Sequence, residues 1–195
     1  YHKLYRTRLC RGKYRDESRP VLINNWEATY FDFNEEKILN IAKKAKSVGV
    51  ELMVLDDGWF GKRNREDCSL GDWVVDYNKL PNGIKGLADK IEDLGMKFGL
   101  WFEPEMVSED SDLYRSHPDW CIHVQGRKRT PSRNQLVLDL TRKDVRDYVV
   151  GAVSDVLSSA PISYVKWDMN RNMSEIGSAE IENERQQEIS HRYIL

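Results

Sequence analysis

The sequence predicts an α/β fold with a parallel sheet, because it alternates buried-strand and amphipathic-helix patterns three times and then adds a fourth strand. The strand segments are apolar throughout, which is typical of parallel strands covered on both faces. Polar and aromatic residues follow the strands, and no glycine-rich first turn typical of doubly wound folds is present. These observations favour a (β/α)8 TIM barrel, whose active sites lie at the carboxyl ends of the strands.

The length of the chain limits how much of a barrel it can contain. The sequence has 195 residues, whereas a complete barrel needs about 250. We therefore predict that the chain covers about strands 1–4, which is half a barrel. Residues 1–20 are rich in Lys and Arg without apolar periodicity, so we interpret them as a connecting arm and assign residues 21–195 to the N-terminal half of the (β/α)8 domain.

The first strand and helix are indicated by local signals. An apolar run at residues 21–23 ends at the polar segment 24–26 and predicts the first strand. Asn34 is a predicted N-cap, because acidic residues follow it in the first turn and apolar residues continue at helical spacing. Gly49 is expected to end this helix, and residues 50–55 then form the second strand.

The later elements repeat this pattern. Thr141 and Asp144 have the spacing of a capping box, which predicts the start of the third long helix. The remaining predicted elements are a helix at residues 84–94, a strand at 97–102, a short apolar run at 136–140, a strand at 162–167 and a further helix from about residue 179.

Composition excludes several classes of protein. The 30 basic and 32 acidic residues leave a net charge of -2, which argues against a nucleic-acid partner, and no apolar stretch is long enough to span a membrane. The three cysteines and four histidines lack ligand spacing, so neither a disulfide framework nor a metal site is expected. The cysteine usage and the absence of an apolar leader at the first residues predict a cytoplasmic protein.

Asp168 is the first candidate for chemistry. Lys166 and Asp168 point the same way at the end of the fourth strand, because residues alternate faces along a strand. A neighbouring ammonium lowers the pKa of a carboxyl group and keeps it ionised, and an ionised carboxylate is what a covalent glycosidase nucleophile must be. A purely structural Lys–Asp ion pair is the alternative interpretation.

Further candidates follow the other strands. Asp56 and Asp57 form either a turn before Gly58 or a pair of acceptors for sugar hydroxyls. Two tryptophans at strand ends are either core residues or platforms for a sugar ring. Two glutamates after the third strand could supply a general acid, and spacing alone does not exclude them. These residues are Trp26, Trp101, Glu103 and Glu105.

Five segments, in order along the chain, closely resemble the bacterial α-galactosidases of glycoside hydrolase family 36. They are residues 24–31, 55–61, 99–105, 133–139 and 166–171. The resemblance implies that Asp168 is the catalytic nucleophile of a retaining mechanism and that Asp56 and Asp57 hold galactose hydroxyls. It also implies that Glu103 and Glu105 have supporting roles. The other residues expected to bind substrate are Trp26, Trp101, Arg133, Lys166, Trp167, Met169 and Asn170.

By this resemblance the protein is a retaining exo-α-galactosidase that hydrolyses terminal α-galactosides of the raffinose and melibiose type through a galactosyl-enzyme on Asp168. Its general acid/base follows a later strand, beyond Leu195, so residues 1–195 alone are expected to be inactive. Expected partners are an α-galactoside oligosaccharide, the remainder of the barrel and, for the full-length enzyme, further copies of itself; no cofactor is expected. The alternatives are an α-N-acetylgalactosaminidase of the same fold and a catalytically incompetent fragment that binds sugar.

Overall fold

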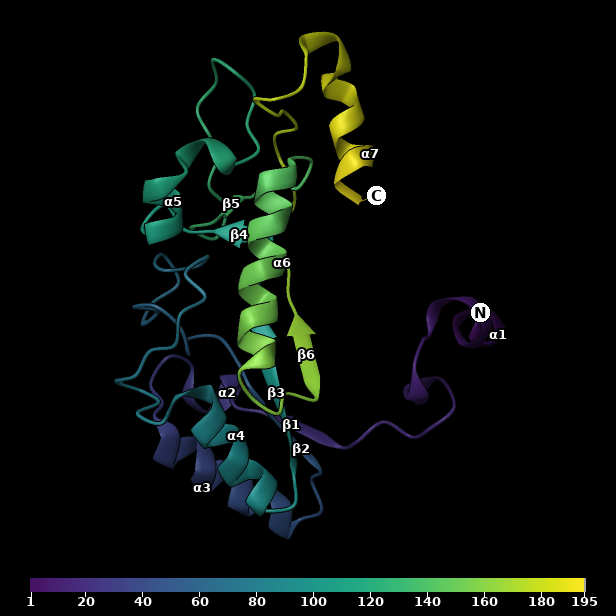
Figure 1. The fold of residues 1–195 in the computed structure, drawn as a ribbon, viewed down its shortest axis with the longest axis vertical. Coiled ribbons are helices and arrows are strands. Elements are labelled where there is room, and N and C mark those ends of the chain that lie inside the picture. Colours follow the sequence, from purple (N-terminus) through teal and green to yellow (C-terminus); the bar gives the residue numbers. More distant parts are fainter. Residues whose placement is uncertain (195) are drawn as a thin grey trace.

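The computed structural model describes residues 1–194 and is built on a four-stranded parallel sheet (Figure 1). The strands follow one another in the order β1-β2-β3-β6, so neighbours in the sheet are also successive strands of this sheet along the chain. This order and direction are those of consecutive strands in a (β/α)8 barrel, and they confirm the predicted partial barrel. The bounds of the strands are Leu22–Asn24, Leu52–Leu55, Lys97–Phe102 and Tyr164–Trp167.

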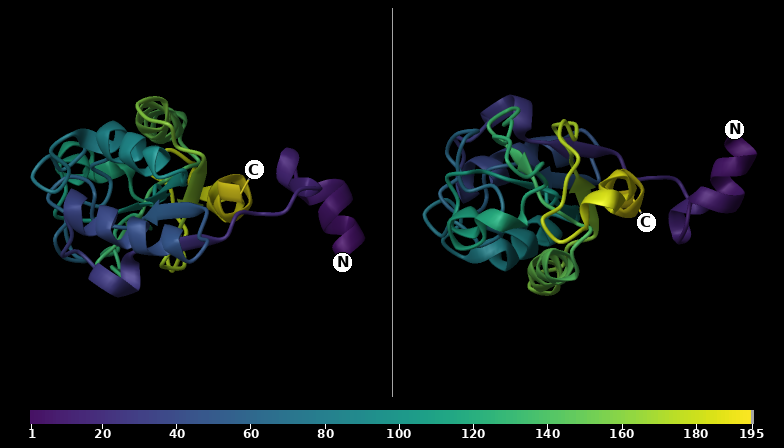
Figure 2. Two further views of the ribbon diagram at one scale, coloured as in Figure 1. Left: turned by 90° about the horizontal axis from the view of Figure 1, so that it is seen from below. Right: turned by 90° about the horizontal axis from the view of Figure 1, so that it is seen from above.

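Three long helices connect these strands and lie on the same side of the sheet (Figure 2): α3 (Glu35–Ser47), α4 (Gly83–Asp93) and α6 (Lys143–Ser158). The start of α3 agrees with the prediction, because the Asn34 side chain accepts a hydrogen bond from the backbone N–H of Lys37 at 2.9 Å. The connection after each strand therefore returns over one face, and the carboxyl ends of the strands all lie at the same edge of the sheet.

The capping box predicted at Thr141 and Asp144 is wrong. Helix α6 begins at Lys143, its N-cap is Arg142, and no side chain caps it. The Thr141 hydroxyl donates instead to the Asp139 carboxylate at 2.5 Å, and Asp144 pairs with the Arg142 guanidinium at 2.8 Å. The sequence has the spacing of a capping box, but the Thr141 side chain bonds to Asp139 and the Asp144 side chain pairs with Arg142 instead.

Smaller elements complete the described chain. The antiparallel pair β4 (Met106–Val107) and β5 (Leu136–Val137) lies beyond the sheet edge, together with α5 (Asp112–Ser116). The helix predicted from about residue 179 begins later, with a 3-10 turn at Asn183–Glu188 followed by α7 (Ile189–Ile194). Helix α1 (His2–Leu4) stands apart from the sheet in Figure 1, whereas the 3-10 turn at Lys13–Arg15 reaches β3, where Lys97 donates a hydrogen bond to the Tyr14 hydroxyl at 3.1 Å. The short helix α2 (Trp26–Thr29) follows β1.

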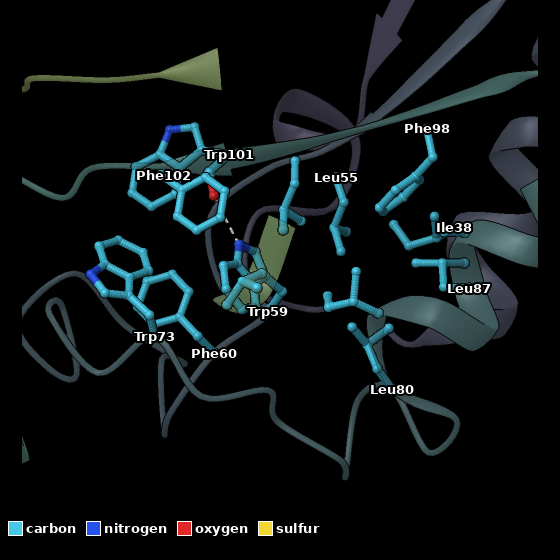
Figure 3. Close-up of a cluster of buried hydrophobic side chains, with 14 of the residues drawn as sticks. Ile38, Leu55, Trp59, Phe60, Trp73, Leu80, Leu87, Phe98, Trp101 and Phe102 are labelled. Atoms are coloured by element: carbon cyan, nitrogen blue, oxygen red, sulfur yellow. Dashed lines mark hydrogen bonds between the residues drawn. The ribbon is translucent and has the colours of Figure 1, made fainter. Parts of the chain in front are cut away.

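The core lies between the sheet and the helices, and it continues as an aromatic cluster under the ends of β2 and β3 (Figure 3). Trp59 is fully buried there, and its indole N–H donates to the backbone carbonyl of Trp101 at 2.9 Å. The Trp59 ring also meets Phe60 and Phe102 edge-on. This packing holds the backbone at the strand ends in place, and this backbone carries the polar residues.

Replacing Ile38 by alanine is expected to lower the free energy of unfolding by about 2–5 kcal/mol, because its side chain is fully buried and its removal leaves a cavity between α3 and the sheet. Chemical denaturation of the full-length protein would measure the change. The matched control is Ile194→Ala, because Ile194 is 81% exposed. Equal unfolding midpoints for the two variants would contradict this view of the core.

Candidate active site

A polar cavity of about 220 Å³ lies at the carboxyl ends of the four strands. It is the place where the sequence predicted the site, since consecutive parallel strands bring their ends to one edge. Most of the predicted residues line it, together with three that the sequence did not single out. The lining residues are Trp26, Asp56, Asp57, Arg63, Glu66, Trp101, Glu103, Arg133, Gln135, Lys166, Asp168 and Asn170.

Asp168 follows β6 and is held by three donors. The Trp101 indole N–H and the Asn170 side-chain amide donate to its Oδ2 at 3.0 and 2.9 Å, and the backbone N–H of Met169 donates to Oδ1 at 3.1 Å. Partial burial acts to raise the pKa of Asp168, but these hydrogen bonds, with a smaller contribution from the Lys166 charge, lower the pKa below its ordinary value. The carboxylate is therefore ionised at neutral pH.

The ammonium of Lys166 binds Asp56 rather than Asp168. Its Nζ lies 2.7 Å from Asp56 Oδ2, an ion pair that joins β6 to the end of β2. Asp56 also accepts a hydrogen bond from the Asn24 side chain, and its own backbone N–H donates to Asn25 Oδ1 at 2.8 Å. The expected effect of the Lys166 charge on the pKa of Asp168 is present, but the hydrogen bonds from Trp101 and Asn170 lower this pKa more. The alternative of a structural ion pair between Lys166 and Asp168 is wrong, because Lys166 pairs with Asp56.

Asp57 forms a buried ion pair with Arg63. The guanidinium donates to both carboxylate oxygens, with Nε 3.0 Å from Oδ1 and Nη2 2.9 Å from Oδ2. Burial raises the pKa of Asp57, and the hydrogen bonds and charge of Arg63 only partly oppose that rise. Gly58 follows with a φ of 103°, a left-handed conformation that turns the chain away directly after the two aspartates.

Glu103 is a buried carboxyl group in the wall of the cavity. It accepts hydrogen bonds from the backbone N–H of Asn170 and from the side-chain amide of Gln135, the latter at 3.1 Å. Burial raises the pKa of Glu103. On the cavity rim, Arg133 donates to the side-chain oxygen of Asn170 at 3.0 Å, so Asn170 connects Arg133, Glu103 and Asp168.

Two predicted substrate-binding residues do not line the cavity. Trp167 and Met169 are 53% and 43% exposed and alternate along the chain with residues that do line it. The Trp167 indole N–H donates to Glu105 at 2.9 Å, and the Tyr193 hydroxyl donates to the same carboxylate at 2.7 Å. Glu105 therefore connects α7 to β6 outside the cavity. Because residues alternate faces along a strand, Trp167 at the end of β6 is directed away from the face of Lys166.

A larger hollow of about 680 Å³ lies elsewhere, between the loop of residues 61–75, α5 and α6. None of the predicted site residues lines it. Among residues 1–194, no group of three or more His, Cys, Asp or Glu side chains is arranged to hold a metal ion. No helix in the same part of the chain is long and apolar enough to cross a membrane.

The arrangement suits a neutral ligand with many hydroxyl groups. Asp56, Asp57 and Asp168 supply acceptors, and each is already oriented by a fixed donor. Trp26 and Trp101 supply apolar surface at the same cavity, which matches a sugar ring with one polar and one apolar face. The partly buried, ionised carboxylate of Asp168 beside such a ligand is also placed to act as a nucleophile.

Sequence reasoning missed Arg63, Glu66 and Gln135. Arg63 and Glu66 lie in a polar loop after β2, where nothing local distinguishes a buried arginine from a solvated one. Gln135 was within reach, because it belongs to the segment 133–139 that carries the family resemblance. Its neighbours Arg133 and Asn134 have φ values of 49° and 57°, so this segment turns sharply beside the cavity.

Comparison with known proteins matches residues 1–195 to the Melibiase family. The curated alpha-galactosidase AgaA of Geobacillus stearothermophilus is 65% identical over 195 residues, which are 100% of this chain and 27% of that protein. A crystal structure of an AgaA variant in complex with raffinose has a TM-score of 0.96 at 64% identity, and another in complex with stachyose has 0.95 at 64%. Each alignment covers 98% of this chain and 27% of the solved chain. The chain thus spans about a quarter of the length of these relatives.

Proposed function

Because the chain belongs to the Melibiase family of glycoside hydrolases, we propose that the protein containing it is a retaining exo-α-galactosidase. The observation that carries this proposal is the Asp168 carboxylate at the end of β6, with its pKa lowered inside a cavity of hydroxyl acceptors. A retaining glycosidase needs an ionised carboxylate at its sugar site and a second carboxyl group about 5–5.5 Å away.

In the proposed first step, an oxygen of Asp168 attacks the anomeric carbon of galactose and forms an ester bond. The glycosidic C–O bond breaks as a general acid gives its proton to the leaving oxygen, and water then hydrolyses the ester with net retention. By the family resemblance the general acid/base lies beyond Leu195. The hydrogen bonds from Trp101 and Asn170 support the role of Asp168, because they stabilise the charge that the attack requires.

We propose that the substrates are terminal α-galactosides of oligosaccharides of the raffinose type. Two AgaA variants, which are 64% identical to this chain, have been crystallised with raffinose and stachyose. A cavity of about 220 Å³ that is lined by the buried acceptors Asp56 and Asp57 supports recognition of a terminal sugar. Asp56 and Asp57 would accept hydrogen bonds from its hydroxyls, and Trp26 would contact its apolar face.

The experiment is an assay of the full-length protein on nitrophenyl α-galactoside, its N-acetyl counterpart and raffinose. We expect cleavage of the galactoside and of raffinose, and an α-configured galactose as the first product seen by NMR. Faster cleavage of the N-acetyl substrate would favour an α-N-acetylgalactosaminidase instead. A β-configured first product would contradict the retaining mechanism, and cleavage of neither substrate would contradict the proposed activity.

Replacing Asp57 by asparagine is expected to weaken galactose binding by about 1.5–3 kcal/mol for each charged hydrogen bond lost. The carboxylate supplies two acceptor oxygens, whereas the amide offers one and directs an N–H group at a hydroxyl or at Arg63. Galactose titration of the full-length variant would measure the loss. The matched control is Asp67→Asn, whose side chain is about half exposed on the same loop. Unchanged galactose affinity, combined with loss of one limb of the pH–rate profile, would assign Asp57 to proton transfer instead.

We also propose that the protein is cytoplasmic and that its full-length form is a homo-oligomer. Cys10, Cys68 and Cys121 are free thiols, which supports a reducing compartment. Thiol titration of the protein purified without reductant would test the first proposal, and its mass in solution would test the second. Free thiols and a mass equal to a multiple of the chain mass are expected.

The boundary between a connecting arm at residues 1–20 and the catalytic domain remains a prediction.

A further inference from the structure

Arg63 is a buried cation in the wall of the cavity that the proposed chemistry does not use. Its side chain is 2% exposed, although a charged group this deep is costly unless it is paired. Its Nε and Nη2 atoms face both oxygens of Asp57, a two-point contact that the planar guanidinium can make and an ammonium cannot. The contact therefore fixes the rotation of the carboxylate as well as its charge.

The same guanidinium holds the loop that passes beside the cavity. Its Nη1 atom donates to the backbone carbonyl oxygens of Glu66 and Cys68 at 2.8 and 2.9 Å. Glu66 lines the cavity, and its carboxylate lies 3.9 Å from Nη2 of Arg133 on the rim. Loss of Arg63 would thus free the Asp57 carboxylate and also the loop segment at residues 66–68, which lies beside the cavity.

The guanidinium also packs against the aromatic side of the cavity. Its central carbon lies 5.5 Å from the centre of the Phe31 ring, and Phe31 meets the Trp26 ring edge-on with the ring centres 5.1 Å apart. Arg63 is therefore connected to the polar side of the cavity through Asp57 and to the aromatic side through Phe31.

We propose that Arg63 is a positioning residue, which holds the Asp57 carboxylate in the one orientation that accepts hydrogen bonds from a pair of sugar hydroxyls. This inference rests on the proposed function, because it assigns to Asp57 a sugar as its ligand. A carboxylate has about four acceptor sites. Arg63 donates to both oxygens of Asp57 and fixes the plane of the carboxylate, and the acceptor sites that it does not use would accept the hydroxyls.

Four charged groups act on Asp57 and define the expected pH behaviour. Arg63 favours its ionised form, as does the more distant Lys79, whereas the carboxylates of Asp56 and Glu103 oppose it. Burial already raises the pKa of Asp57. Without the guanidinium this pKa rises further, so the carboxyl group takes up its proton at a higher pH. Galactose binding is then lost at a higher pH, because a protonated carboxyl accepts hydroxyl hydrogen bonds less strongly.

The test uses Arg63→Met and Arg63→Lys in the full-length protein, with Arg65→Met as the matched control. Arg65 lies on the same loop but pairs with Asp67 and Asp110 at the surface. We expect Arg63→Met to raise KM and the galactose inhibition constant about tenfold or more, with a smaller change in kcat. The acidic limb of kcat/KM should move to higher pH. Arg63→Lys should lie between Arg63→Met and the unchanged protein, and Arg65→Met should match the unchanged protein.

A double variant separates positioning from general stability. If Arg63 acts through Asp57, Arg63→Met should add little to the loss already caused by Asp57→Asn, and the pair should be strongly non-additive. The double variant also removes both buried charges, so it can be measured even where Arg63→Met alone does not fold. Three results would overturn the inference. The losses of galactose affinity in the two single variants could add in the double variant, or the acidic limb of folded Arg63→Lys could stay in place. The third is that Arg63→Met, Arg63→Lys and the double variant all fail to fold.

These outcomes are distinct from failure of the proposed function. If the unchanged full-length protein neither cleaves α-galactosides nor binds galactose, the proposed function itself is wrong. If the unchanged protein does both, and the Arg63 variants keep its galactose affinity and pH profile, only the role of Arg63 is wrong.

Discussion

Replacing Asp168 by alanine in the full-length protein is expected to lower kcat for nitrophenyl α-galactoside at least about 10⁴-fold. The substitution removes the carboxylate that is proposed to form the galactosyl ester, while the hydrogen-bond donors of Trp101 and Asn170 stay in place. Azide should restore part of the turnover, because a small anion fits the space left by the carboxylate. The product should be galactosyl azide with inverted configuration, since azide attacks from the face that Asp168 used.

The matched control for this prediction is Asp147→Ala. Asp147 lies on the exposed face of α6 and pairs there with Lys143, so its removal should leave kcat unchanged. Turnover by Asp168→Ala equal to that of the control would contradict the assignment of the nucleophile. Loss of turnover without rescue by azide, but with intact galactose binding, would indicate that Asp168 orients the substrate rather than attacks it.

The second large effect is expected for the isolated polypeptide of residues 1–195, which should show no measurable α-galactosidase activity. Hydrolysis with retention needs two carboxyl groups, and the resemblance locates the acid/base beyond Leu195. Glu103 is the cavity carboxyl group that the sequence offered as an alternative acid, and burial does raise its pKa as an acid requires. Both of its oxygens, however, accept hydrogen bonds from N–H groups, of Asn170 and Gln135, which favours the ionised form and occupies the carboxylate.

The isolated polypeptide also leaves β1 and β6 as unpaired edges of the sheet, which are prone to pair with other chains. A mass-verified preparation should therefore be assayed beside the full-length protein at equal molar concentration, with its solution mass measured. We expect association or aggregation together with inactivity. Activity that disappears on Glu103→Gln would contradict the prediction and identify Glu103 as the acid.

The sequence predicted best those features whose causes are local. Helix α3 begins where Asn34 caps it, because the cap, the acidic first turn and the apolar stripe all act within a few residues. Strand β3 spans the predicted residues 97–102. The meeting of Asp56 and Asp168 at one cavity followed from the parallel direction of their strands, which a pattern of buried strands and helices already implies.

Contacts between residues on different strands or loops could not be predicted from the sequence, because they depend on how the elements pack in three dimensions. Lys166 has one carboxylate after its own strand, Asp168, and one after β2, Asp56, and only the sheet geometry decides that it pairs with Asp56. The burial of Arg63 depends on how the loop folds over the strand ends. The capping box at Thr141 failed for a related reason, because Asp139 lies within hydrogen-bond distance only in the folded turn.

The parallel connectivity also affects the order in which the site forms during synthesis and folding. Asp56 and its partner Lys166 are 110 residues apart in sequence, and Trp101 and Asp168 are 67 apart. During synthesis from the N-terminus, the aspartates after β2 are made long before the cation and the nucleophile that complete the cavity. Contacts of such long range form late and slow folding, so Asp56 has no Lys166 partner until β6 is made, whereas Asp57 has Arg63 only six residues away. Because an unpaired carboxylate is costly to bury, we expect Asp56 to stay hydrated until β6 has joined the sheet.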